Sequence, residues 1–181
     1  MPKKWDRVQE RPGAALIGTD TAELAVQGES RRTVTLTGIE FQVTRHPVPQ
    51  GSSFAMPCGG PGYGRSIVVD LDRNPPRVVD SNRDVEGIIG SELNDRGQPT
   101  PIRFPWTVSL TDSLLLFVVA ETKSCYCEWT ARIPWVSGSQ RGTIVLDDED
   151  GGFRVVGERG FPQYLPSFEP PYHRWEHVSY P

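Results

Sequence analysis

The chain has 181 residues, a net charge of −4 and a pI near 5.4. This length suffices for one sizeable domain with its own hydrophobic core. An acidic balance without runs of Lys or Arg argues against a nucleic-acid surface and against an anionic membrane patch. No apolar stretch approaches the roughly 18–20 residues that span a bilayer, and residues 1–6 carry no apolar segment typical of a secretion signal. We therefore expect a cytoplasmic protein that contacts neither nucleic acid nor a membrane directly.

Alternating apolar and polar side chains predict one long strand over residues 32–46. The apolar residues of its first half, Val34 and Leu36, have even numbers, whereas those of its second half, up to Val43, have odd numbers. The phase of the alternation therefore changes at Gly38. An extra residue at a glycine forms a β-bulge, which re-aims a strand and keeps its apolar face inward.

Further strands are expected at residues 22–28, 66–71, 77–79, 102–110, 114–120, 143–146 and 153–156. Pro105 cannot donate a hydrogen bond to a neighbouring strand, so we expect residues 102–110 at a sheet edge or broken at this proline. Residues 114–120 are apolar at every position, which predicts a strand buried on both faces.

Residues 125–135 predict the clearest strand of the chain. Cys125, Cys127 and Trp129 share one parity with other apolar residues, and the opposite parity is mostly polar. Successive side chains of a strand point to opposite faces, so these three side chains should enter one core layer. Three tryptophans are expected in or near the core: Trp106, Trp129 and Trp135.

Strand–turn–strand repetition without a helical period predicts an all-β protein. We expect an antiparallel β-sandwich, immunoglobulin-like or jelly-roll-like, of about eight to ten strands. The 17 prolines and 18 glycines agree with a fold of many turns and few helices. Residues 1–20 are expected to form a loose N-terminal arm, residues 21–157 the sandwich domain, and residues 158–181 a C-terminal strap.

The strap alternates prolines with aromatic side chains. Prolines keep the segment extended, and aromatic residues on this scale need a surface to cover. The strap therefore either crosses its own domain or docks on a partner, and the sequence leaves both open. The candidate partner-binding residues are Phe161, Tyr164, Phe168, Tyr172, Trp175 and Tyr180.

The three cysteines, Cys58, Cys125 and Cys127, form a candidate thiol cluster. They could be reduced thiols that fill core space, one disulfide from Cys58 to either of the others, or a metal site completed by a histidine. A bond between Cys125 and Cys127 is not expected, because extended residues two apart sit at or beyond the usual Cα separation of a disulfide. We expect Cys58 to approach this strand and all three thiols to react poorly.

The remaining motifs of the sequence indicate no reaction and no ligand. Residues 59–66 imitate a phosphate loop, with Arg65 where a lysine belongs, but a strand follows instead of the helix whose N-terminus would face the phosphate. The acidic residues 147–150 could bind calcium, yet they lack the alternating spacing of a calcium-binding loop. Their position indicates the solvent-exposed tip of a β-hairpin. The chain has no nucleophile elbow, no zinc-protease motif and no supported Cys–His pair. We therefore assign no catalytic residue, no metal ligand and no cofactor.

Several blocks of the sequence together resemble a group of actinobacterial β-rich proteins with no established activity. The resemblance covers roughly residues 22–160 and rests on the motifs PCGG at 57–60, FPWTVS at 104–109, CYCEW at 125–129 and WVSG at 135–138. In the proteins that it resembles, the module occurs alone or behind a helix-turn-helix or a membrane anchor. That setting implies a sensory, scaffolding or partner-binding role, and it identifies no catalytic residue.

The leading hypothesis is a non-catalytic β-sandwich interaction module, a scaffold or a regulatory or assembly component that binds another protein. One alternative is a hydrolase or lyase on a sandwich scaffold, with Asp70, Asp72 or His46 as its reactive groups. A second alternative is a metal- or redox-sensing module built on the thiol cluster. The sequence leaves homo-oligomerisation open.

Overall fold

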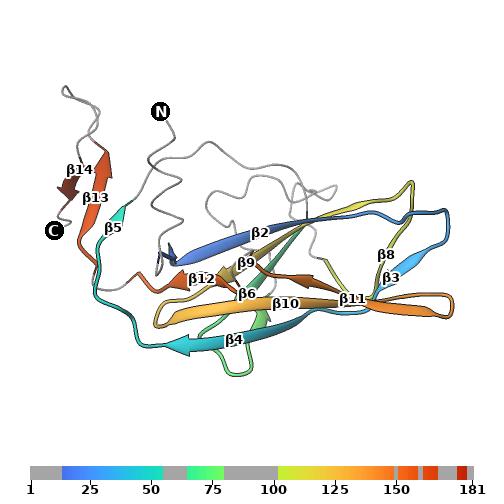
Figure 1. Ribbon diagram of the computed structural model, residues 1–181, viewed down its shortest axis with the longest axis horizontal. Coiled ribbons are helices and arrows are strands. Elements are labelled where there is room, and N and C mark those ends of the chain that lie inside the picture. The colour runs from blue at the N-terminus through green and yellow to red at the C-terminus, as the bar shows by residue number, and fades with distance from the viewer. Residues whose placement is uncertain are drawn as a thin grey trace.

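The computed structural model describes residues 14–54, 65–79, 102–148, 151–158, 161–166 and 175–178, and every regular element in them is a β-strand (Figure 1). A seven-stranded sheet packs against a four-stranded sheet, and a three-stranded sheet lies at one end. The predicted all-β sandwich is confirmed. The described residues hold 14 strands instead of about eight to ten, because several of them are only two to four residues long.

The seven-stranded sheet is built around β10 (Tyr126–Ser137), the longest strand. It confirms the strand predicted over residues 125–135, except that Cys125 precedes it. One side of β10 pairs with two successive strands, and the other side pairs with two more. The remaining strands of this sheet are β1 (Leu16–Ile17), β3 (Val34–Leu36), β4 (Glu40–His46), β8 (Trp106–Val108), β11 (Gln140–Leu146) and β12 (Phe153–Val156).

The four-stranded sheet has the order β2 (Thr19–Val26), β9 (Leu114–Glu121), β6 (Arg65–Asp70) and β7 (Arg77–Val79). Strands β6 and β9 run parallel, as do β1 and β12. The sheets are therefore mixed, and the expectation of a purely antiparallel fold is wrong. A parallel pair needs a long crossover connection, which the chain between β6 and β9 is long enough to supply.

The bulge predicted near Gly38 is present between β3 and β4. In β3, Leu36 pairs with Trp135 of β10, whereas in β4, Glu40 pairs with Arg132. The segment from Leu36 to Glu40 thus advances by four residues while β10 advances by three, from Trp135 to Arg132. The difference is the one extra residue of a bulge. Both halves keep their apolar side chains toward the core as a result.

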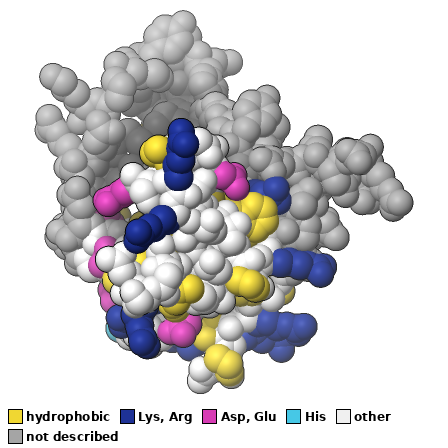
Figure 2. Space-filling model, turned by 90° about the vertical axis from the view of Figure 1, so that its right-hand side faces the viewer, with side chains coloured by type: hydrophobic (Ala, Val, Ile, Leu, Met, Phe, Trp, Pro, Cys, Tyr) yellow, Lys and Arg dark blue, Asp and Glu magenta, His cyan; other side chains and the backbone are white. Residues whose placement is uncertain are grey.

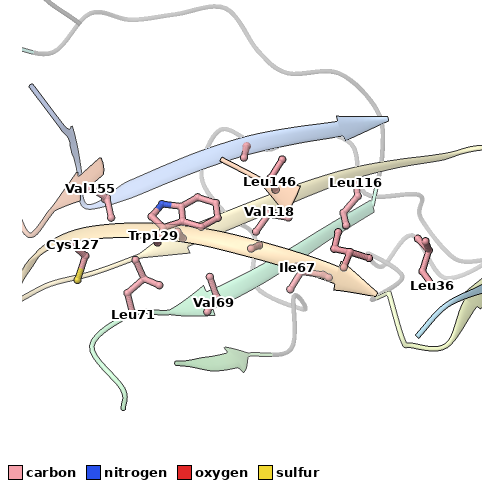
Figure 3. Close-up of a cluster of buried hydrophobic side chains, with 14 of the residues drawn as sticks. Leu36, Ile67, Val69, Leu71, Leu116, Val118, Cys127, Trp129, Leu146 and Val155 are labelled. Atoms are coloured by element: carbon pink, nitrogen blue, oxygen red, sulfur yellow. The ribbon is translucent and has the colours of Figure 1, made fainter. Parts of the chain in front are cut away.

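The core lies between the two large sheets. Trp129 of β10 is 1% exposed and stacks on Phe153, with ring centroids 4.7 Å apart. Figure 3 shows its indole between β10 and β2, and the same core cluster includes Val69 of β6 and Val118 of β9. The prediction that Trp129 is buried is confirmed, and Trp106 and Trp135 pack half-buried against the same cluster. Fully buried side chains of this core include Leu36, Val69, Leu71, Leu116, Val118, Cys127, Ile133 and Val155.

Two strand predictions that depended on single features are also confirmed. Strand β9 is buried on both faces, since Val118 and Val119 are each 0% exposed although they point in opposite directions. Strand β8 starts immediately after Pro105 and is the last strand in the order of its sheet. The proline thus both shortens this strand and lies at an edge, where a missing donor costs least.

The chain passes from one large sheet to the other at Gly18. Its amide donates to the carbonyl of Val156 at 2.7 Å, and its carbonyl accepts from Thr122 at 2.9 Å. Its φ of 73° lies in the left-handed region that glycine tolerates best. Strands β1 and β2 begin before residue 21, so residues 16–17 and 19–20 belong to the sheets and the predicted loose arm does not extend over them. Residues 1–13 lie outside the described residues.

The C-terminal strap contributes the third sheet. Strand β13 (Gln163–Pro166) pairs antiparallel with β14 (Trp175–Val178) and parallel with β5 (Ser53–Phe54), which comes from the loop after β4. The amide of Ser53 donates to the carbonyl of Pro162 at 2.9 Å. The described part of the strap is thus held to its own chain by backbone pairing.

Candidate functional site

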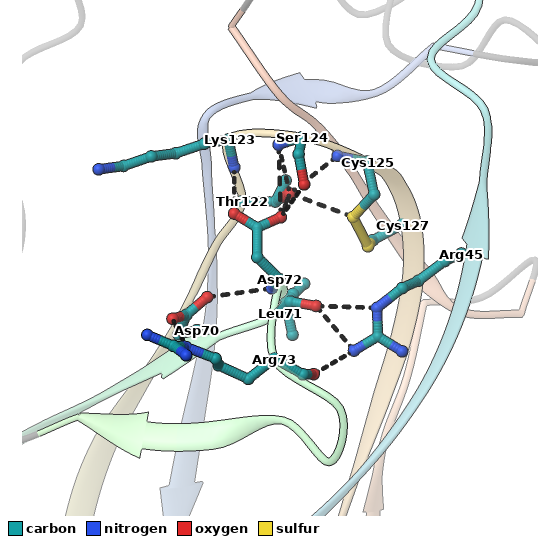
Figure 4. Close-up of a disulfide and its surroundings, with 10 residues drawn as sticks. All are labelled: Arg45, Asp70, Leu71, Asp72, Arg73, Thr122, Lys123, Ser124, Cys125 and Cys127. Carbon is teal, nitrogen blue, oxygen red and sulfur yellow. Dashed lines mark hydrogen bonds and ion pairs between the residues drawn. A yellow bond between two sulfur atoms is a disulfide. The ribbon is translucent and has the colours of Figure 1, made fainter.

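The carboxylate of Asp72 accepts four hydrogen bonds from three consecutive residues, Thr122 to Ser124 (Figure 4). It accepts from the Thr122 hydroxyl at 2.7 Å and from the Lys123 amide at 2.9 Å. Ser124 donates twice, from its hydroxyl at 2.8 Å and from its amide at 3.3 Å. The connection that follows β6 is therefore tied to the turn between β9 and β10.

The pKa of Asp72 lies below its ordinary value of 3.8. Burial alone would raise this pKa, but the hydrogen bonds from Thr122, Lys123 and Ser124 stabilise the ionised form and together outweigh it. A lowered pKa in the folded state means that these bonds stabilise the fold at neutral pH. That stabilisation is lost as the pH falls and the carboxylate is protonated.

Arg45 holds the same connection from the opposite side. Its guanidinium donates to the carbonyl of Leu71 through Nε at 3.0 Å and through Nη2 at 2.8 Å, and Nη2 also donates to the carbonyl of Arg73. Figure 4 shows Arg45 reaching from β4 to this loop. Because both Asp72 and Arg45 fix it, the loop after β6 is anchored to β4 and to the β9–β10 turn at once.

Cys125 and Cys127 form a disulfide, so the prediction that these two residues do not bond to each other is wrong. The prediction assumed an extended chain, whose Cα atoms two residues apart would be about 6.6–6.8 Å from each other. Cys125 instead lies in the turn before β10, where its amide donates to Thr122 Oγ1 at 3.3 Å. The Cα–Cα separation is therefore only 5.5 Å, a normal value for a disulfide.

The disulfide is buried against the core. Cys125 is 7% exposed and Cys127 is 0% exposed, which agrees with the predicted inward position of both. Thr122 Oγ1 lies 3.1 Å from Sγ of Cys125 and thereby joins the disulfide to the Asp72 network. Cys58, the third member of the predicted thiol cluster, lies outside the described residues.

Of the residues of the hydrolase alternative, Asp70 and Asp72 are neighbours in one network, whereas His46 lies apart from them. The carboxylate of Asp70 pairs with Arg73 at 3.4 Å and accepts from the amide of Asp72 at 3.0 Å. His46, on β4, lies 3.9 Å from Glu128. A hollow of about 330 Å³ lies beside this loop, and the described residues of its lining, which include no acid or histidine, are Arg73, Asn74, Pro75, Pro76 and Arg77.

Asp20 is a buried carboxylate that the sequence did not single out. It is 5% exposed, and Trp129 Nε1 donates to its Oδ2 at 3.1 Å. Burial raises its pKa to about 6, and the negative charge of Asp148 adds to the increase. The hydrogen bond from Trp129 lowers the pKa but does not outweigh burial. A carboxyl in such a position titrates close to neutral pH.

An aromatic cluster occupies the three-stranded sheet. Phe54 of β5 stacks on Tyr164 of β13, with centroids 5.4 Å apart, and meets the edge of Trp175 of β14 at 5.0 Å. His177 of β14 contacts Tyr164 at 5.5 Å. Phe54 and Trp175 remain 40% and 39% exposed. We call these four residues the aromatic cluster.

The aromatic cluster contains two of the six candidate partner-binding residues, Tyr164 and Trp175. Phe161 is half-buried and outside the cluster, next to Gly51. Phe168, Tyr172 and Tyr180 lie outside the described residues. Sequence reasoning missed Phe54 because it is distant from the strap in the chain, and no local signal marks its parallel pairing with β13.

The two loop motifs give no site in the described residues. Residues 59–64 of the phosphate-loop imitation lie outside them, and its last two residues, Arg65 and Ser66, begin strand β6. Asp148, in the acidic run, forms a bridge with Gly151 at a hairpin turn. The part of the chain that the structure describes contains no group of three or more His, Cys, Asp or Glu side chains arranged to hold a metal ion.

In the same part of the chain, no helix is long and apolar enough to cross a membrane. Comparisons of this chain with protein-family models, with curated proteins and with solved structures find no match.

Proposed function

We propose that this chain is a non-catalytic β-sandwich module that binds a protein partner through the aromatic cluster, as a scaffold or as a regulatory or assembly component. The observation that supports the proposal is the exposure of Phe54 and Trp175 within a set of mutually packed rings. Large aromatic side chains contribute most of the binding energy at protein interfaces, and packed rings lose little entropy on binding.

The opposite face of the molecule offers a contrast. Figure 2 shows the opposite end of the molecule, where hydrophobic side chains are scattered singly among Lys, Arg and polar groups. Single exposed apolar side chains are normal on a protein surface, whereas a cluster of them marks an interaction site. The aromatic cluster is therefore the surface that we assign to the partner.

The test is capture of partners from the native host by the purified chain, with identification by mass spectrometry. We expect Trp175→Ala to lose at least about 1 kcal/mol of binding, or roughly fivefold in affinity, because truncated interface aromatics commonly cost this much. Val136→Ala is the matched control, since Val136 is 42% exposed and lies on β10, outside the aromatic cluster. A partner set captured equally by both variants would contradict the proposal.

A second candidate function, redox sensing, is favoured by the Cys125–Cys127 disulfide. Oxidation state would then control the shape of the β9–β10 turn, to which Asp72 attaches the loop after β6. The proposal of redox sensing also depends on the cellular compartment of the protein. The sequence suggests the cytoplasm, where disulfides are rare unless they are transient or act in redox sensing.

A count of free thiols tests the bonded state. With three cysteines in the chain and two of them in one disulfide, one thiol should react after denaturation in protein purified without reductant. After reduction, all three should react. Three reactive thiols in the unreduced protein would show that the disulfide does not form. If reduction leaves partner capture unchanged, the redox function is wrong and the interaction module is unaffected.

A further inference from the structure

Both cysteines of the disulfide adjoin a residue that holds the loop after β6 (Figure 4). Sγ of Cys125 lies 3.1 Å from Oγ1 of Thr122, whose hydroxyl donates to Asp72 at 2.7 Å. Cys127 lies directly opposite Arg45 in the pairing of β10 with β4, and the guanidinium of Arg45 donates to two carbonyls of the same loop. The disulfide therefore links Thr122 and Arg45, which we call the two anchors of this loop.

The disulfide also fixes the shape of the chain at Cys125. Its Cα atom lies 5.5 Å from that of Cys127, whereas residues two apart in an extended chain are about 6.6–6.8 Å from each other. The alternating pattern of residues 125–135 favours an extended chain through Cys125. Its carbonyl already accepts from the amide of Gly157, which follows the last paired residue of β12. Without the covalent bond, β10 can therefore lengthen by one residue.

Such a change would disturb the hydrogen bonds at the first anchor. Oγ1 of Thr122 accepts from the amides of Ser124 and Cys125, each at 3.3 Å. Extension of the chain moves Cys125 by about 1 Å, which is more than the spread of lengths that a hydrogen bond tolerates. Thr122 is 2% exposed, so water does not readily replace a lost partner. The four hydrogen bonds to Asp72 come from this same turn.

We propose that the oxidation state of Cys125 and Cys127 controls how firmly the loop after β6 is held. The disulfide keeps the two anchors at the spacing at which Asp72 and Arg45 bind together, and the reduced form loses that spacing. The loop also lines the hollow of about 330 Å³, whose shape thereby depends on the disulfide. The inference rests on the redox-sensing candidate, for which it names the responding element, and it is independent of the aromatic cluster.

A dithiol reductant opens the bond in two balanced steps. One of its thiolates attacks Sγ of Cys125, because Cys125 is 7% exposed whereas Cys127 is 0% exposed. The S–S bond breaks, a mixed disulfide forms on Cys125, and Cys127 leaves as a thiolate that takes up a proton. The second thiol of the reductant then displaces Cys125, which is protonated in turn, and closes the disulfide of the reductant. Two electrons and two protons thus pass from the reductant to the protein.

Coupling between two parts of a protein is reciprocal, so the loop must stabilise the disulfide in turn. The equilibrium constant for reduction by dithiothreitol measures this effect, on a Cys58→Ser background that keeps the third thiol out of the exchange. We expect Asp72→Asn and Arg45→Gln each to favour reduction by about fivefold or more, the lower end of the usual range for coupled sites. A purely structural role would destabilise both forms equally and leave this constant unchanged.

Asp112→Asn and Arg141→Gln are the matched controls, and both should leave the reduction constant unchanged. Both residues are exposed. Asp112 precedes β9, so the eight residues of that strand separate it from the turn. Arg141 lies on β11 opposite Val136, near the end of β10 that is distant from Cys127. Thermal melting of each oxidised variant establishes that it is folded.

Amide hydrogen exchange of the unmodified chain gives a second measurement, which needs no variant. The amides of Lys123 and Ser124 donate to Asp72 and should exchange at least about fivefold faster after reduction. The amides of β11 should keep their rates, because the fold persists. Equal exchange of the turn in both forms overturns the inference, as does a reduction constant that either variant leaves unchanged, although the disulfide could still sense redox state by another route. Cysteines that stay reduced in protein purified without reductant would overturn both the inference and the redox-sensing candidate.

Discussion

Replacing Trp129 with alanine is expected to lower the free energy of unfolding by about 3–5 kcal/mol, the usual range for a large core aromatic. The indole is 1% exposed and packs on Phe153 and Phe41, with centroids 4.7 and 6.3 Å away. Its removal would leave a cavity between the sheets and would deprive Asp20 of a hydrogen-bond donor. Denaturant unfolding monitored by circular dichroism measures the change.

Trp135→Ala is the comparison for this substitution. Trp135 is on the same strand but only half-buried, so its loss should cost clearly less. A midpoint of denaturation that is unchanged in the Trp129 variant would mean that the register of β10 is wrong. Equal effects of the two substitutions would show that burial does not control the energetics of this strand.

Ionisation of Asp20 is expected to reduce stability by roughly 2–2.5 kcal/mol between pH 4 and pH 7, because each pKa unit corresponds to 1.36 kcal/mol and a small part of the change falls below pH 4. The pKa is about 6 in the folded chain, against an ordinary value of 3.8. The folded state therefore holds this proton more tightly than the unfolded state does. The stability that Asp20 contributes is present below the unfolded pKa and is lost as the pH rises through the folded pKa.

Asp20→Asn isolates this effect, because an amide does not ionise but can still accept from the indole of Trp129. The free energy of unfolding of the variant, relative to that of the unmodified chain, should be higher at pH 7 than at pH 4 by roughly 2–2.5 kcal/mol. Other carboxylates, such as Asp72, titrate in both proteins and cancel in the difference. A difference that does not vary with pH would assign Asp20 an ordinary pKa.

Local patterns in the sequence were sufficient to predict much of the sandwich. The change of parity at Gly38 predicted the bulge because one extra residue is the way a strand keeps its apolar face inward across such a change. The unbroken apolar run of β9 predicted burial on both faces for a similar reason. The parallel pairs, such as β6 with β9, depend on contacts between distant segments, which no local pattern encodes.

The site was harder to predict, and Asp20 shows why. We expected the first strand to begin at Ala22, but β2 begins at Thr19. Asp20 has the same parity as the buried Ala22 and the half-buried Leu24, so a longer strand would have placed it in the core. The Cys125–Cys127 bond was missed because Thr122 and Ser124 bend the chain before β10, and hydroxyl residues at a turn are only a weak signal.

The Cys125–Cys127 bond closes a loop of only three residues along the chain. By the chain-entropy relation, such a short loop restricts the unfolded ensemble by only about 1.6 kcal/mol, compared with about 3 kcal/mol for a loop of 15 residues. The covalent link therefore contributes little to the cohesion of the sandwich, in contrast to disulfides that join distant segments of small secreted domains. In a reducing environment the domain would keep its fold and lose only the fixed shape of one turn.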